Sequence, residues 1–174
     1  MMHQETPGFP MQSVAMDILG PLPVTKRNNR YVIVFTDRFS RFVEIEALVD
    51  QEATTVADAI VKCIVLRHGA PRVLLSDRGA NFLSSLMKEI YQRLSIDKRQ
   101  TTAYHPAAHG LVERFNSTLL NIVSMFVNSS QKNWDELLSF AAFNTTLFVI
   151  QRLNSPQFMC YMVEIPIGTI MTLM

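Results

Sequence analysis

The most informative segment of this chain is Tyr31–Asp37, which has the sequence YVIVFTD. Its continuous apolar run is rich in β-branched side chains, as is typical of a buried strand. Upstream, residues 14–19 form a shorter apolar segment that stops at Gly20 and Pro21. Downstream, residues 42–47 alternate apolar and polar side chains, which indicates a half-exposed strand. Because only short turns separate the three segments, they predict an antiparallel three-stranded beginning.

Helical and extended patterns alternate after this beginning. Helical spacing of apolar side chains predicts helices over residues 54–67, 85–94, 111–126 and 133–144. Thr54 is the expected N-cap of the first helix, and Ser84 or Ser85 that of the second. Short strands are expected at residues 73–75 and 96–102, and a loop at residues 104–110. The pattern predicts an α/β domain with a mixed sheet.

Length and composition exclude several classes of protein. A chain of 174 residues, 48% of them hydrophobic, can bury one sizeable core. No apolar run approaches the ~18–20 residues of a membrane span, so no membrane partner is expected. Cys63 and Cys160 are too few for a disulfide framework or a zinc domain. The expected division is an irregular leader at 1–10, one domain at 11–160 and a divergent tail at 161–174, in an intracellular protein, nuclear or cytoplasmic.

Three acidic residues occupy positions of chemical interest. Asp17 lies within an apolar strand, where an uncompensated charge is costly. Asp77 follows a short buried strand, and α/β folds place functional groups at such ends. Glu113 lies in the first turn expected for a helix, where it could simply complement the helix dipole. Taken singly, each is more often a structural residue, and catalysis would require all three at one point.

The motifs around these acids occur in a specific order. They are MDILGPLP at 16–23, TDRFSRFVE at 36–44, GAP at 69–71, SDRGANF at 76–82, TTAYHP at 101–106 and GLVERFN at 110–116. Residues 78–112, which separate Asp77 from Glu113, number 35. From residue 14 to about residue 156 the chain thereby resembles the catalytic core of retroviral and Ty3/gypsy-type retrotransposon integrases, of the DDE superfamily. The resemblance implies a ribonuclease H-like three-layer domain with a five-stranded mixed sheet flanked by helices.

The resemblance also implies an activity. Asp17, Asp77 and Glu113 correspond to the catalytic carboxylates that hold two Mg²⁺ or Mn²⁺ ions, with Asp17 shared between them. Hard oxygen ligands suit these ions. A metal pair can activate the attacking oxygen and stabilise the leaving oxygen at phosphorus. The implied reactions are DNA 3′-end processing by water and strand transfer by a DNA 3′-hydroxyl. Asp37 matches a non-catalytic turn of the family and is left out of the site.

Further residues are expected to contact DNA. Tyr104, His105 and Pro106 resemble a loop that approaches the DNA end, and His109, Arg114 and Asn116 follow it. Pro106 argues against a continuous helix beneath His105 and His109, so zinc is not favoured there. Basic residues cluster at 26–30, 38–41 and 98–99. Each cluster is a candidate for phosphate contact, although a solvated face is the more common role of such clusters.

Some positions depart from the family pattern. Residues 107–109 read AAH, where relatives usually carry amide side chains, and residues 164–174 diverge. The resemblance implies DNA as the partner, both element ends and target, and a homo-oligomer. Two alternatives remain open: a simple metal-dependent nuclease of the same fold, and a domesticated or decayed, non-catalytic nucleic-acid-binding module. Joining of labelled DNA ends separates transferase from nuclease, and a Mg²⁺ titration separates both from an inert module.

Overall fold

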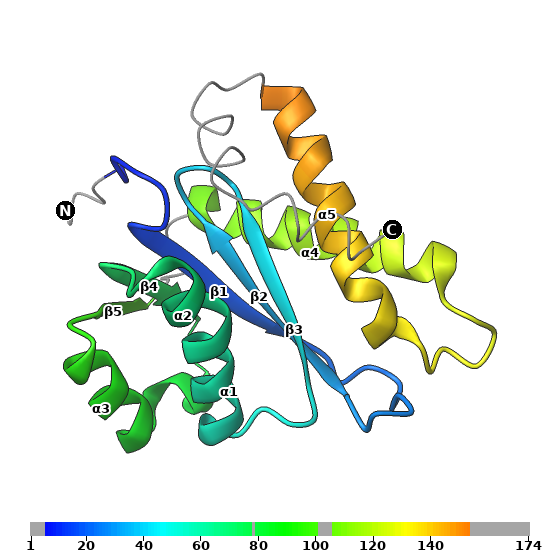
Figure 1. The fold of residues 1–174 in the computed structure, drawn as a ribbon, viewed down its shortest axis with the longest axis horizontal. Coiled ribbons are helices and arrows are strands. Elements are labelled where there is room, and N and C mark those ends of the chain that lie inside the picture. Colours follow the sequence, from blue (N-terminus) through cyan, green and yellow to red (C-terminus); the bar gives the residue numbers. More distant parts are fainter. Residues whose placement is uncertain (1–5, 78, 101–105, 154–174) are drawn as a thin grey trace.

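A five-stranded mixed sheet forms the centre of the molecule (Figure 1). The computed structural model describes residues 6–77, 79–100 and 106–153. The strands are β1 (Ser13–Leu19), β2 (Tyr31–Asp37), β3 (Val43–Leu48), β4 (Val73–Ser76) and β5 (Asp97–Gln100), in the spatial order β3-β2-β1-β4-β5. The first three strands pair antiparallel, as predicted, whereas β4 and β5 join parallel to β1. The predicted fold class is confirmed.

Helices cover both faces of this sheet. The first face is covered by α1 (Ala53–Ile60) and by α3 (Ser85–Arg93). Helix α1 continues through the π-helical η1 (Val61–Val65) into α2 (Leu66–His68). The second face is covered by α4 (Pro106–Phe126) and α5 (Trp134–Leu153). A short 3₁₀ turn, η2 (Ala80–Leu83), lies between β4 and α3. No helix within the described ranges combines the length and apolar character needed to cross a bilayer.

Two cores result from this layering. On the sheet face covered by α1 and α3, the core includes the strand residues Val14, Ile33, Phe35 and Leu74. The opposite core joins Val32 and Val34 of β2 to α4 and α5, where the only tryptophan, Trp134, is buried. The Trp134 Nε1 donates a hydrogen bond to the Pro23 carbonyl oxygen at 2.6 Å. Consecutive residues of β2 therefore serve opposite cores, and this explains why YVIVFTD is apolar without alternation.

Helix boundaries differ from several sequence-based expectations. Glu52, not Thr54, occupies the N-cap of α1, while Ser84 caps α3 and accepts a hydrogen bond from the Met87 amide. The segment expected as a loop at 104–110 is helical from Pro106 onward. Proline suits a first helical position because it has no amide hydrogen to leave unbonded there.

The length of one helix and the buried face of two others also differ from the sequence-based expectations. Helix α5 continues to Leu153, well past the expected end at residue 144. In α3 the buried residues are Met87 and Tyr91, whereas Leu86 is exposed. Phe126, expected on the inner face of its helix, is also exposed. The other expected inner faces are confirmed. Residues buried as predicted are Val56, Ile60, Ile64, Phe115, Leu119, Trp134, Leu138 and Ala141.

Candidate metal and nucleic-acid site

Asp17 of β1 and Asp77, which directly follows β4, belong to two neighbouring parallel strands of the sheet. The β1–β4 register pairs Ala15 with Leu75, and each aspartate lies two residues further along its strand. Parallel neighbours lie about 4.8 Å apart across a sheet, so the register brings two residues 60 positions apart in sequence to one edge. Asp77 is exposed, and its Oδ1 accepts a hydrogen bond from the Gly79 amide at 3.0 Å.

Asn116 of α4 connects the second helical layer to this pair. Its Nδ2 donates to Asp17 Oδ2 at 2.8 Å, and the Ile18 amide donates to Asp17 Oδ1 at 2.9 Å. Asn116 is buried, and its Oδ1 has no hydrogen-bond partner within the described part of the chain. Two donors on separate oxygens fix the plane of the Asp17 carboxylate. Asn116, expected from the sequence as a DNA contact, is therefore a positioning residue for Asp17. The sequence did not predict this particular hydrogen bond.

Glu113 lies on α4, three residues before Asn116. Residues three apart share one face of a helix, so its backbone position is on the face that reaches β1. The structure does not describe its side chain, and the same holds for His109 and Arg114 of this helix. Pro106 begins the helix, and the expected DNA contacts Tyr104 and His105 lie outside the described residues. Where side chains are described, no three His, Cys, Asp or Glu residues form a metal-binding group.

Lys98 lies close enough to Asp77 for the two charges to interact. Its Nζ donates to Ser76 Oγ at 2.5 Å and to the Arg99 carbonyl at 2.9 Å, and it lies 5.8 Å from the Phe82 ring centroid. Burial lowers the pKa of Lys98 to about 8, and the charge of Asp77 acts in the opposite direction. Lys98 was one of several candidate phosphate contacts, for which a solvated face was the more common role. In the structure its side chain is half-buried and bonded to Ser76 of β4.

Asp37 also ends a strand but belongs to a turn. It is buried, and its Oδ2 accepts hydrogen bonds from the Ser40 amide at 2.8 Å and the Ser40 hydroxyl at 2.5 Å. The Phe39 amide donates to its Oδ1 at 3.3 Å. These donors stabilise the carboxylate locally, which agrees with leaving Asp37 out of the site.

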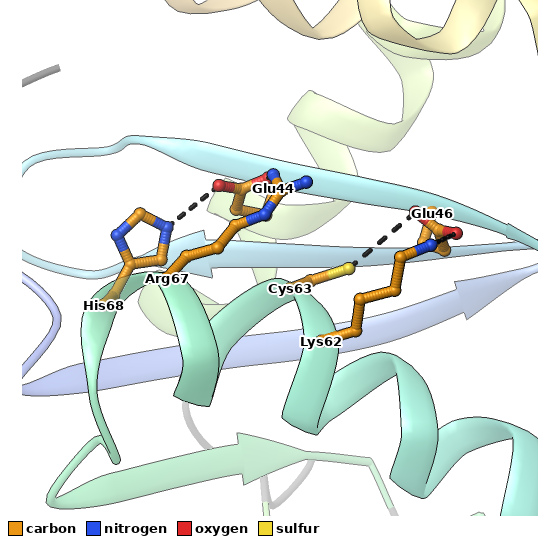
Figure 2. A network of polar contacts seen from close by, with 6 residues as sticks. All are labelled: Glu44, Glu46, Lys62, Cys63, Arg67 and His68. Atoms are coloured by element: carbon orange, nitrogen blue, oxygen red, sulfur yellow. Dashed lines mark hydrogen bonds and ion pairs between the residues drawn. The ribbon is translucent and has the colours of Figure 1, made fainter. Parts of the chain in front are cut away.

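A second pair of acidic residues lies on β3, facing η1 and α2 (Figure 2). Glu44 pairs with Arg67 at 2.8 Å and with His68 at 2.9 Å. Glu46 pairs with Lys62 Nζ at 2.6 Å and accepts from Cys63 Sγ at 3.8 Å. Each glutamate is therefore satisfied by side chains of the adjoining helices. This network connects the edge strand β3 to the helical layer. Because its acids are paired with basic side chains, it is not an alternative to the metal site expected at Asp17 and Asp77.

Comparison with known proteins shows which family the chain resembles in sequence. The integrase core domain family matches residues 9–106. The chain is 28% identical over 144 residues to the retrovirus-related Pol polyprotein from transposon 412 of Drosophila melanogaster, covering 82% of this chain and 12% of that protein. It is 28% identical over 166 residues to gypsy retrotransposon integrase-like protein 1 of Mus musculus, covering 91% and 30%. The chain thus spans less than a third of either relative.

Solved structures share the fold. One is a simian T-cell lymphotropic virus intasome in complex with PP2A regulatory subunit B56 gamma, with a TM-score of 0.68 and 22% identity over 81% of this chain and 50% of that one. Another is the catalytic core domain of BIV integrase, with a TM-score of 0.60 and 21% identity over 76% of this chain and 81% of that one. Because the family match spans more than half of the sequence and the sheet and helices agree with it, this chain belongs to the integrase core domain family.

Proposed function

We propose that this chain is the catalytic core of a divalent-metal-dependent polynucleotidyl transferase, which carries out DNA 3′-end processing and strand transfer. Asp17, Asp77 and Glu113 are its metal ligands, and DNA is its substrate. The observation that supports this most directly is the β1–β4 register, because it brings Asp17 and Asp77 to one edge of the sheet. The helix that carries Glu113 also supplies Asn116 to Asp17.

The residues at this edge fit a pair of Mg²⁺ or Mn²⁺ ions. Carboxylate oxygens are hard ligands, and each carboxylate offers about four lone-pair positions. Asp77 is exposed, with one oxygen bonded to the Gly79 amide, so it can take a ligand without a buried contact being broken. When bound, two such ions would activate an attacking oxygen and stabilise a leaving oxygen at phosphorus.

The chain's own residues orient the acids. Asn116 and the Ile18 amide hold the two oxygens of Asp17 in one plane. The carboxylate therefore needs little reorganisation when a metal ion binds. The Gly79 amide likewise holds one oxygen of Asp77. Lys98, bonded to Ser76 beside Asp77, adds positive charge where phosphate oxygens would approach. No side-chain nucleophile is required, because the attacking oxygen comes from water or from DNA.

Partners and location are part of the proposal. DNA ends and a target duplex are the substrates, and the chain acts as a homo-oligomer within the cell, either in the nucleus or in the cytoplasm. As an isolated core it binds DNA weakly and with little sequence preference, and its affinity falls as salt rises. A preformed branched DNA is the most suitable substrate, since it demands less positioning than two separate ends.

The test combines thermal melts with DNA joining. Wild type, Asp77→Asn and the matched control Asp58→Asn, an exposed acid of α1, are melted with EDTA and with Mg²⁺ or Mn²⁺. At about 100 times the dissociation constant the metal adds roughly 2.7 kcal/mol to the stability of wild type and control. The variant Asp77→Asn gains far less and joins no labelled branched DNA.

Each alternative gives a different result. Metal-dependent cutting without any joining would establish the simple nuclease in place of the transferase. An equal metal response in wild type and Asp77→Asn would remove Asp77 from the ligands and overturn the proposal. Binding of DNA with no metal response at all would leave the non-catalytic binding module.

A further inference from the structure

A cavity of about 300 Å³ lies at the amino-terminal ends of the parallel strands β1, β4 and β5. It is lined by Ser13, Val73 and Asp97, the first residues of these strands, and by three arginines, Arg38, Arg72 and Arg99. Since a water molecule occupies about 30 Å³ in the liquid, the space suffices for a phosphodiester group with several waters. We call it the arginine cavity.

Backbone hydrogen bonds hold the walls of the arginine cavity in place. The Arg38 amide donates to the Ser13 carbonyl at 2.9 Å, and the Asp97 amide donates to the Arg72 carbonyl at 2.9 Å. Arg99 lies within β5, in register with Leu75 of β4. Each arginine therefore extends from a backbone tied to the sheet. A ligand would meet guanidinium groups on a rigid frame, which lowers the ordering cost of binding.

Positive side chains outnumber acidic ones among the described residues that line the arginine cavity. These residues include three arginines and one acid, Asp97, which pairs with Arg99 at 2.8 Å. Burial, and after it the positive charge of Arg99, lowers the pKa of Arg38. Guanidinium groups nevertheless keep their charge in proteins. An anion in the cavity would relieve this repulsion, and planar guanidinium donors match the oxygens of a phosphate.

The arginine cavity and the acidic pair share one side of the sheet. Ser13 and Asp17 are an even number of residues apart on β1, as Val73 and Asp77 are along β4 and its continuation, so each pair lies on the same face. Four residues of strand span about 13 Å. Duplex DNA rises 3.4 Å per base pair along each strand, so the same span covers roughly four base pairs. Measured along the strands, the acids and the arginine cavity are therefore about four base pairs apart.

We propose that the arginine cavity binds a backbone phosphate of the DNA substrate, roughly four base pairs from the phosphate at Asp17 and Asp77. The proposal rests on the function proposed above and adds a second point of contact to it. One phosphate near the acids and another in the cavity would fix the direction in which the strand crosses the sheet. This contact carries no sequence preference, because it involves the backbone alone.

The test measures DNA affinity without catalysis. Fluorescence anisotropy of a labelled duplex follows binding by the full chain in EDTA, at salt concentrations from ~50 to ~200 mM. The variant is Arg72→Gln, whose side chain is exposed, so the fold should tolerate the change. The control is Arg93→Gln, which removes the same charge from the exposed surface of α3, on the other face of the sheet.

Arg72→Gln should reduce the slope of log affinity against log salt by about 0.9, the value for one phosphate contact. Extrapolated from 1 M salt, this slope corresponds to an affinity about eightfold weaker at ~0.1 M salt. Arg99→Gln should act similarly, and Arg93→Gln should leave the slope unchanged. Equal slopes for Arg72→Gln, Arg93→Gln and wild type would overturn the proposal.

An experiment with inorganic phosphate distinguishes a DNA backbone phosphate from free phosphate as the ligand of the arginine cavity. It should shift the amide resonances of Arg72 and Arg99 and compete with the duplex. If it shifts these resonances while Arg72→Gln leaves the DNA slope unchanged, the cavity binds free phosphate and the proposal for DNA fails. Since no step depends on metal, a chain that proves inactive but retains the Arg72-dependent slope would disprove the catalytic function and leave the phosphate contact standing.

Discussion

Asn116 of α4 donates a hydrogen bond to Asp17 of β1 across 99 positions of sequence, at 2.8 Å. The bond joins the helix that carries Glu113 to the central strand of the sheet. Because Asn116 is buried, the orientation of Asp17 depends on the packing of the whole second layer. An exposed acid would be free to rotate, whereas this one is held.

The first prediction concerns the strength of this bond. Asn116→Ala removes a donor to a charged acceptor, so the free energy of unfolding at pH 7 should fall by about 1–3 kcal/mol. In a double-mutant cycle with Asp17→Ala, the coupling energy should be about 0.5–3 kcal/mol. Urea unfolding of the four proteins measures it. Additive effects of the two substitutions would show that the hydrogen bond contributes nothing to stability.

The second prediction concerns the different roles of Asp37, the last residue of β2, and Asp77, which follows β4. Asp37→Asn weakens the bonds to Ser40 in a buried turn, so it should lower the free energy of unfolding by about 1–3 kcal/mol. Asp77→Asn retains an oxygen for the Gly79 amide at an exposed position, so in EDTA it should change stability by less than about 0.5 kcal/mol. Thermal and urea unfolding of both variants provide the comparison.

The Mg²⁺-dependent rise in melting temperature should distinguish the same two variants in the opposite way: the variant with the larger loss of stability keeps it. Asp37→Asn should keep the full Mg²⁺-dependent rise in melting temperature, while Asp77→Asn should lose most of it. A lost response in Asp37→Asn, measured where that variant is still folded, would contradict the separation of turn from site.

The third prediction concerns Cys63. Burial, followed by the charge of Glu46, raises the pKa of this thiol to about 12, above the unfolded value of about 8.5. The protonated thiol therefore favours the folded state fully below about pH 8.5, and this contribution is lost as pH rises toward 12. At pH 8 iodoacetamide should react with Cys63 slowly in the folded protein and rapidly in urea.

A Cys160→Ser background makes Cys63 the only thiol in that experiment. Mass spectrometry of the alkylated protein gives the rate. Alkylation at equal rates with and without urea would show that the thiol is not shielded by the helical layer and β3.

The fourth prediction tests the start of α3. Ser84 accepts a hydrogen bond from the Met87 amide, so Ser84→Ala should cost about 1 kcal/mol of stability. Ser85 is the exposed first residue of the helix, and Ser85→Ala should change stability by less than about 0.5 kcal/mol. Equal losses in the two variants, measured by urea unfolding, would contradict the cap assignment.

Local patterns in the sequence determined much of the fold. The apolar run of β2 and the alternation before Leu48 were enough to predict the antiparallel strands. Helical spacing located α4, but its start at Pro106 was missed, because proline and glycine were interpreted as loop signals although proline is favoured at a first helical position. Family motifs, not periodicity, selected Asp17, Asp77 and Glu113 from fifteen acids.

The tertiary structure alone decided which of these residues meet. The β1–β4 pairing that aligns Asp17 with Asp77, and the bond from Asn116 to Asp17, join segments far apart in the chain. The arginine cavity likewise combines residues of three strands with residues of four segments that precede or connect strands. Propensity and periodicity act over a few residues, so they specify a strand or a helix but not its neighbour. Pairing follows from the burial of apolar faces by the whole domain, and only that packing brings distant charges together.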